Sequence, residues 1–150
     1  MKKLNDGRGY DLDYYNLYLR RYLREHRFPE ADDDLFIANR AEAASNVYVE
    51  SRLNGDEVYI ASQRAIDRLT EGLEISPYDF VSELLINEFA DHISLNERSI
   101  GFWTYTLLAE LAPEFKDVEL GEEFFSTNEG VIFKLVITSR IAEYFDEYGL

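Results

Sequence analysis

Residues 129–148 read EGVIFKLVITSRIAEYFDEY, and the predicted fold class depends on whether they form a helix or a strand. The segment Val131–Thr138 is rich in β-branched residues, which prefer strands. Three features favour a helix instead. Ser126-Thr-Asn-Glu129 has the pattern of a capping box, the run continues to Tyr148 without a helix-breaking residue, and Gly149 stands where a helix C-terminal glycine is expected. We therefore predict one long C-terminal helix.

The first half of this predicted helix is apolar on every side when it is placed at 3.6 residues per turn. Its apolar residues are Val131, Ile132, Phe133, Leu135, Val136 and Ile137. A helix without a polar face is normally enclosed by other helices. The sequence therefore predicts a largely buried C-terminal helix, with the rest of the chain packed around it.

Apolar residues recur at helical spacing in five earlier segments, each bounded by a capping residue, a glycine or a proline. The segments cover residues 11–27, 33–53, 56–73, 77–93 and 99–112. Residues 115–125 are acidic and without clear periodicity, and residues 1–10 contain two glycines and read as a flexible arm. We predict an all-α fold, in which residues 11–150 form a single-domain bundle or orthogonal array of about six helices.

Composition excludes several classes of protein. The chain has 150 residues and no cysteine, so it has neither disulfides nor thiolate metal sites. No signal peptide or membrane-length apolar run is visible, which predicts a soluble, cytoplasmic protein. Fifteen basic against thirty acidic residues give a formal net charge of −15. We therefore expect no direct binding of nucleic acid or of an anionic membrane.

One basic stripe stands out in this acidic chain. Arg20, Arg24 and Arg27 fall on one side of the first predicted helix, with Leu17 among them. One interpretation is a solvated helix face that pairs with acidic neighbours. The other is a phosphate-binding or partner-docking face, and we retain these four residues as a possible partner surface.

The fourth predicted helix places Glu88 and His92 one turn apart on its apolar side. An ionised Glu on an apolar face needs a partner, and Arg40, which lies inward on the second predicted helix, could form a buried ion pair with it. Alternatively, Glu88 and His92 could act as an acid and base or as two metal ligands. Carboxylate-bridged metal bundles repeat Glu-x-x-His on two helices, whereas this chain has Glu-x-x-x-His once. We therefore assign no catalytic, cofactor-binding or metal residues.

Recognisable catalytic patterns are missing: we find no glycine-rich phosphate loop, nucleophile elbow or paired-histidine zinc helix. The sequence instead has tyrosines and apolar residues in surplus over the predicted core faces, as interaction surfaces often do.

Several short motifs together resemble one known family. They are Tyr14-Tyr15-x-Leu17-Tyr18-Leu19-x-x-Tyr22-Leu23-Arg24-Glu25, Phe36-Ile37-x-x-Arg40-Ala41, Gly72-Leu73-x-x-Ser76-x-Tyr78, Asn87-Glu88-Phe89-Ala90 and Glu147-Tyr148-Gly149-Leu150. They are similar to a family of small, uncharacterised Bacteroidetes proteins, known as a domain of unknown function. The resemblance implies an all-helical fold and carries over no catalytic residue. Members of such a family are often encoded on mobile elements.

Three functions remain open at this point. The leading hypothesis is a non-enzymatic helical module that binds a protein partner and that could form a homodimer. The second is an acidic DNA mimic of the anti-restriction type, encoded on a mobile element. The third is a cryptic enzyme or metal protein centred on Glu88 and His92.

Overall fold

The structure is a computed structural model that describes residues 11–149. The chain divides into two compact units, the first ending at Glu71 and the second beginning at Gly72. The predicted flexible arm, residues 1–10, lies outside the described residues. The grouping of residues 11–150 into a single domain stays a prediction, and each unit is described by itself below.

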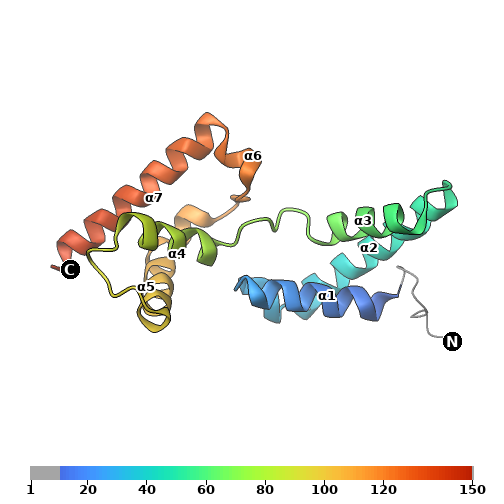
Figure 1. Cartoon of the computed structure of the whole chain (residues 1–150), viewed down its shortest axis with the longest axis horizontal. Helices are drawn as coiled ribbons and strands as arrows, with labels where there is room; N and C mark the ends of the chain where they lie inside the picture. Colours follow the sequence, from blue (N-terminus) through green and yellow to red (C-terminus); the bar gives the residue numbers. More distant parts are fainter. Residues whose placement is uncertain (1–10, 150) are drawn as a thin grey trace. The chain divides into compact units, whose positions relative to one another are not determined.

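All regular elements of the described range are helical (Figure 1). The first unit contains α1 (Leu12–Glu25), a short 3₁₀ helix η1 (Pro29–Asp32), α2 (Asp34–Leu53) and α3 (Val58–Leu69). The second contains α4 (Pro77–Glu88), α5 (Glu97–Phe115), α6 (Glu122–Phe125) and α7 (Asn128–Glu147). The predicted all-α fold is confirmed. The six long helices are those predicted, and η1 and α6 are short additions in segments where we predicted a turn and an irregular stretch.

In the first unit, α2 packs against both α1 and α3 (Figure 1). Ala41 and Ala44 of α2 and Ala61 and Ala65 of α3 are all buried. Small side chains at these positions allow close approach of two helices. Larger side chains fill the remaining core: Tyr15, Leu19, Leu23, Phe28, Ile37, Tyr48 and Leu69.

Local signals set both ends of α2. The side chain of Asp33 accepts a hydrogen bond from the backbone N–H of Phe36, which caps the first turn. At the other end, Gly55 has φ +96°, its N–H donates to the carbonyl of Arg52, and the N–H of Asp56 donates to that of Ser51. This pair of bonds is a Schellman motif, which needs a left-handed residue directly after the helix. Glycine provides that conformation without steric cost.

In the second unit, one apolar core joins α4, α5 and α7. The buried ring of Phe145 on α7 belongs to this core, and its centroid lies 5.5 Å from that of Phe89, 5.3 Å from that of His92 and 5.6 Å from that of Trp103. The other buried members are Phe80, Val81, Leu84, Leu85, Leu107, Leu111, Leu120, Ile137 and Ile141.

The helix α7 is confirmed, but its cap lies one residue later than the predicted capping box. The hydroxyl of Thr127 accepts from the N–H of Gly130 at 3.0 Å and donates to the carbonyl of Phe124 at 2.6 Å. Gly130 is buried because α6 passes directly over it. A Cβ at Gly130 would lie 2.0 Å from the carbonyl oxygen of Phe124, so only glycine fits this backbone contact.

The prediction that α7 is largely buried is wrong. Within residues 11–149, one of its faces is covered, through Gly130, Ile137, Ile141 and Phe145. Four aliphatic side chains on the opposite face are exposed: Val131, Ile132, Leu135 and Val136. The pattern showed that the helix is apolar all round, but it does not show how many neighbours cover it.

Three predicted helix ends also need correction. The third helix ends at Leu69 rather than at residue 73. The fourth helix ends at Glu88 rather than near Ile93, because Phe89 leaves helical geometry and turns into the core against Phe145. The fifth helix continues through Pro113 to Phe115 instead of stopping near Leu111. Proline removes one backbone donor, and within the last turn of a helix this costs less than in its middle.

Candidate interaction surfaces

The candidate pair Glu88 and His92 does not lie one turn apart on the apolar side of one helix, as predicted. Glu88 is the last residue of α4, His92 lies beyond the end of that helix, and both side chains are exposed. The imidazole ring of His92 stacks on Phe145, with an interplanar angle of 5°. Within residues 11–149, no group of three or more His, Cys, Asp or Glu side chains is placed to hold a metal ion.

Because Glu88 is exposed, the reason for a buried ion pair with Arg40 also disappears. Arg40 is half-buried and has contacts within its own unit. Its guanidinium donates to the carbonyl of Leu69 at 3.1 Å and lies 5.0 Å from the ring centroid of Phe36. Leu69 is the last residue of α3, so Arg40 satisfies a carbonyl at a helix C-terminus. A contact between Arg40 and Glu88, which belong to different units, stays a prediction.

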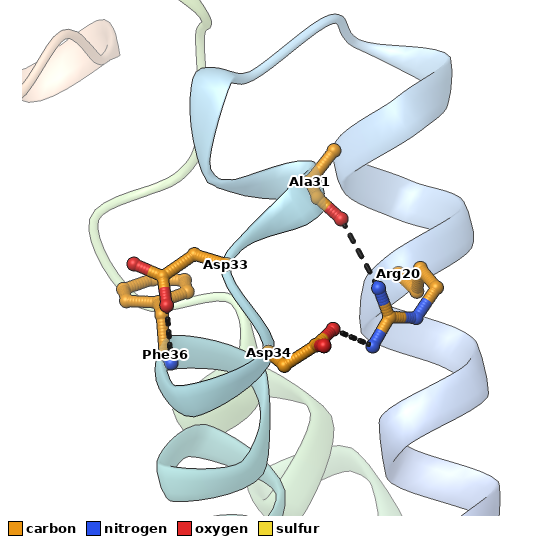
Figure 2. Close-up of polar contacts among 5 residues, drawn as sticks. All are labelled: Arg20, Ala31, Asp33, Asp34 and Phe36. Atoms are coloured by element: carbon orange, nitrogen blue, oxygen red, sulfur yellow. Dashed lines mark hydrogen bonds and ion pairs between the residues drawn. The ribbon is translucent and has the colours of Figure 1, made fainter.

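Arg20, one of the predicted partner-face residues, has a structural role (Figure 2). Its guanidinium donates to the carbonyl of Ala31 at 3.3 Å and to the carboxylate of Asp34 at 2.8 Å. These contacts tie the middle of α1 to η1 and to the first turn of α2. An acidic neighbour therefore neutralises Arg20, as the solvated-face interpretation predicts.

The rest of the predicted basic stripe is interrupted. Arg24 and Leu17 are exposed on α1, but Arg27 lies beyond the helix, at φ +56°. The N–H of Arg27 donates to the carbonyl of Arg24, and the N–H of Phe28 donates to that of Leu23, which completes a second Schellman motif. The three arginines therefore do not form one continuous surface.

A different stripe follows the exposed side of α1 and surrounds a hollow of about 260 Å³. It is lined by Tyr14, Leu17, Tyr18, Arg21, Tyr22 and Glu25, and we call it the α1 stripe. Its central residues Tyr14, Tyr18, Arg21 and Glu25 are separated by four, three and four positions, the spacing of a coiled-coil seam. Of this set, only Leu17 was predicted to belong to a partner face. The four–three–four spacing is the signal that would have identified the others.

A second surface lies on α7 in the other unit. We call Val131, Ile132, Leu135 and Val136 the aliphatic face of α7. Leu135 is the most exposed of them, at 62 %. Farther along the same side, Ser139 and Ala142 are exposed and small, so another helix could approach closely there. Adjacent exposed apolar side chains of this kind mark interaction sites on soluble proteins.

An acidic groove of about 420 Å³ runs between α5 and α7. Its carboxylates are Glu110, Glu143, Asp146 and Glu147. The basic residue at the groove, Arg140, donates to Glu114 at 2.9 Å. The carboxylate of Glu147, together with partial burial, Tyr144 and Glu110, raises the pKa of the neighbouring Tyr148 phenol. The direction of this shift agrees with a negative potential along the groove.

Within residues 11–149, none of the helices combines the length and the apolarity that crossing a lipid bilayer requires.

Comparisons with known proteins agree with this all-helical architecture. The chain is similar in fold to a solved structure described as the crystal structure of protein PG0816 from Porphyromonas gingivalis. The two share 24% sequence identity with a TM-score of 0.78, over 91% of this chain and 92% of the other. No curated protein is significantly similar to the chain. A family model described as a domain of unknown function, DUF1896, matches residues 8–150. The chain therefore belongs to the DUF1896 family.

Proposed function

We propose that this protein is a non-enzymatic helical module that binds a protein partner through the aliphatic face of α7. The proposal depends on one observation: four neighbouring aliphatic side chains are 43% to 62% exposed on a helix whose opposite face is buried at Ile137, Ile141 and Phe145. Covering half of an aliphatic side chain contributes roughly 1 kcal/mol, so the face can supply a substantial part of a binding free energy.

An amphipathic helix of the partner fits this surface best. Val131 and Ile132 lie one turn before Leu135 and Val136, which makes a narrow apolar band parallel to the axis of α7. Such a band matches the i, i+3, i+4, i+7 anchors by which helices bind apolar surfaces. Lys134 interrupts the sequence of apolar residues but lies on another side of the helix, because successive residues are 100° apart.

The experiment compares the full chain with two variants as baits in a lysate of its native cells. Leu135→Glu places a charge in the aliphatic face, and Leu95→Glu is the matched control, since Leu95 is 55% exposed in the link between α4 and α5. We expect a partner that wild type and Leu95→Glu retain through a high-salt wash and that Leu135→Glu loses. Equal recovery with all three baits would contradict the proposal. Thermal melting of each bait confirms that it is folded.

The acidic groove supports a second candidate function, the acidic DNA mimic. Its four carboxylates on α5 and α7 would attract the basic surface of a DNA-binding protein. The salt wash distinguishes the two functions, because exposed charge pairs are screened by salt and apolar contacts are not. A partner of the groove would be lost at high salt and would be insensitive to Leu135→Glu. The cytoplasmic location, which both functions require, stays a prediction.

A further inference from the structure

The α1 stripe has the geometry of a helix-pairing surface. In a coiled coil, each side chain of one helix inserts into a hole formed by four residues of the other, at positions i, i+3, i+4 and i+7. The lining of the hollow contains two such sets that share Tyr18 and Arg21. The first hole is Tyr14, Leu17, Tyr18 and Arg21, and the second is Tyr18, Arg21, Tyr22 and Glu25.

The two ends of this stripe differ in chemistry, so that each end can pack against the opposite end of the same stripe in an antiparallel copy. The N-terminal half presents Tyr14, Leu17 and Tyr18, whereas the C-terminal half presents Arg21, Tyr22 and Glu25. We propose that the α1 stripe binds a second copy of this chain, with the two α1 helices antiparallel. The surface is separate from the aliphatic face of α7, so this inference goes beyond the proposed function and does not depend on it.

Antiparallel pairing about a two-fold axis between Leu19 and Arg20 matches the central members of the stripe. Tyr14 faces Glu25 of the second copy, and Tyr18 faces Arg21. These pairs are a hydroxyl with a carboxylate and an aromatic ring with a guanidinium. Tyr18 of each copy fills the second hole of the other helix, and Arg21 fills the first. Leu17 and Tyr22 lie on opposite flanks of this seam, because successive residues are 100° apart, and each shares its flank with the same residue of the second copy.

The parallel arrangement is unfavourable for the same stripe. It would place Arg21 beside Arg21 and Glu25 beside Glu25 of the second copy, and like charges at close distance repel. The antiparallel arrangement separates these groups along the helix axis. Avoidance of like-charge pairs therefore favours the antiparallel direction for two copies of α1.

The expected affinity is modest. The 14 residues of α1 make a face about 21 Å long. The surface area that such a face can bury is at the lower end of the range for specific interfaces. We expect a dissociation constant of about 10 µM. The dissociation constant should be higher at low salt, because the two copies carry the same net charge and repel each other more strongly there.

Light scattering coupled to gel filtration, with the full chain at about 100 µM, is the first test. We expect a dimer for wild type and at least a roughly tenfold weaker one for Leu17→Glu, because a two-fold interface contains each substitution twice. The matched control is Leu53→Glu, on α2 of the same unit, where the leucine is 82% exposed. A wild-type monomer at this concentration, or a dimer that Leu17→Glu leaves unchanged, would overturn the proposal.

Cross-linking tests the direction and does not depend on the folding of Leu17→Glu. Because the chain has no cysteine, introduced cysteines pair without competition. Under mild oxidation, a mixture of Tyr14→Cys and Glu25→Cys chains should form the mixed disulfide, whereas each variant alone should not. Antiparallel pairing separates Tyr14 from Tyr14 of the second copy by about 16 Å along the axis, beyond disulfide reach. Self-cross-linking of Tyr14→Cys, or no mixed product, would show that the antiparallel pairing is wrong.

Discussion

Tyr15 has a buried hydroxyl for which the described residues provide no hydrogen-bond partner. Burial, with smaller contributions from Tyr14 and Tyr48, raises the pKa of this phenol above its ordinary value. Because the folded pKa is higher than the unfolded one, the contribution to stability is fully present below about pH 10 and is lost as the pH rises through the folded pKa. The loss amounts to about 1.4 kcal/mol per pH unit where only the unfolded state is ionised.

The substitution Tyr15→Phe should remove this part of the alkaline destabilisation. Urea denaturation of wild type and variant at about pH 8 and about pH 11 measures the effect as a difference in the free energy of unfolding. We expect the variant to lose less stability than wild type between the two pH values. Tyr59→Phe is the control, since that ring is 72% exposed, and it should behave like wild type. Identical pH dependence of all three proteins would contradict the prediction.

Thr104 on α5 also has a buried hydroxyl group, but in a side chain that does not ionise. Its side chain is fully buried, and its hydroxyl has no hydrogen-bond partner within the described residues. A buried hydroxyl without a partner is unfavourable, so Thr104→Val should raise the free energy of unfolding by about 1 kcal/mol. Thr106→Val is the matched control, because that hydroxyl donates to the carbonyl of Phe102 at 2.8 Å and its loss should give no gain. The fluorescence of Trp103 reports both denaturation curves, and a loss of stability in Thr104→Val would count against this explanation.

At the scale of the element, the predicted ends of α2 are correct because neighbouring residues in the sequence determine them. The bounds of α2 follow from Asp33 before the helix and Asn54-Gly55 after it, and both act through hydrogen bonds within a few residues. The end of α4 could not be found in this way. No glycine or proline follows Glu88, and the helix stops because Phe89 packs against Phe145, more than fifty positions along the chain.

The corner between α6 and α7 gives a prediction at this scale. In Gly130→Ala, the added methyl group would meet the backbone of Phe124 and Phe125, which cannot rotate away as a side chain could. We expect the free energy of unfolding to fall by about 3 kcal/mol. Gly101→Ala in α5 is the opposite case, because its Cβ would make an ordinary 3.5 Å contact with the hydroxyl of Tyr78. That variant should gain about 0.5 kcal/mol from helix propensity. Equal effects in the two variants, measured by urea denaturation, would contradict this explanation of Gly130.

At the scale of the whole molecule, the all-α fold could be predicted from the sequence. The candidate interaction surfaces could be predicted only in part. Capping residues and apolar periodicity identify the helices, whereas exposure depends on which faces have neighbours. Leu17 is exposed on α1, and its place on a partner face stays a prediction, whereas Arg20 on the same helix has a structural contact with Asp34. Glu88 and His92 seemed paired on one helix only because the end of α4 is determined by tertiary packing. The aliphatic face of α7 was missed because a uniformly apolar sequence cannot show which of its sides remains uncovered.

The distribution of charge between the two units leads to the last prediction. Residues 1–71 have eleven basic and fourteen acidic residues, a net charge of −3, whereas residues 72–150 have four basic and sixteen acidic residues, a net charge of −12. Like charges on a compact unit repel, and salt screens that repulsion. Raising the concentration of NaCl from about 0.05 M to about 0.5 M should therefore stabilise the second unit more than the first.

Hydrogen exchange followed by mass spectrometry resolves this effect by segment. We expect peptides from α5 and α7 to become several-fold more protected at the higher salt concentration, and peptides from α2 to change little. Peptides that line the acidic groove between α5 and α7 should show the largest increase in protection from exchange, because Glu110, Glu143 and Asp146 lie together there. Equal gains in both units would mean that they open as one cooperative body. Lower protection in α7 would mean that its ion pairs, such as Arg140 with Glu114, outweigh the repulsion among its carboxylates.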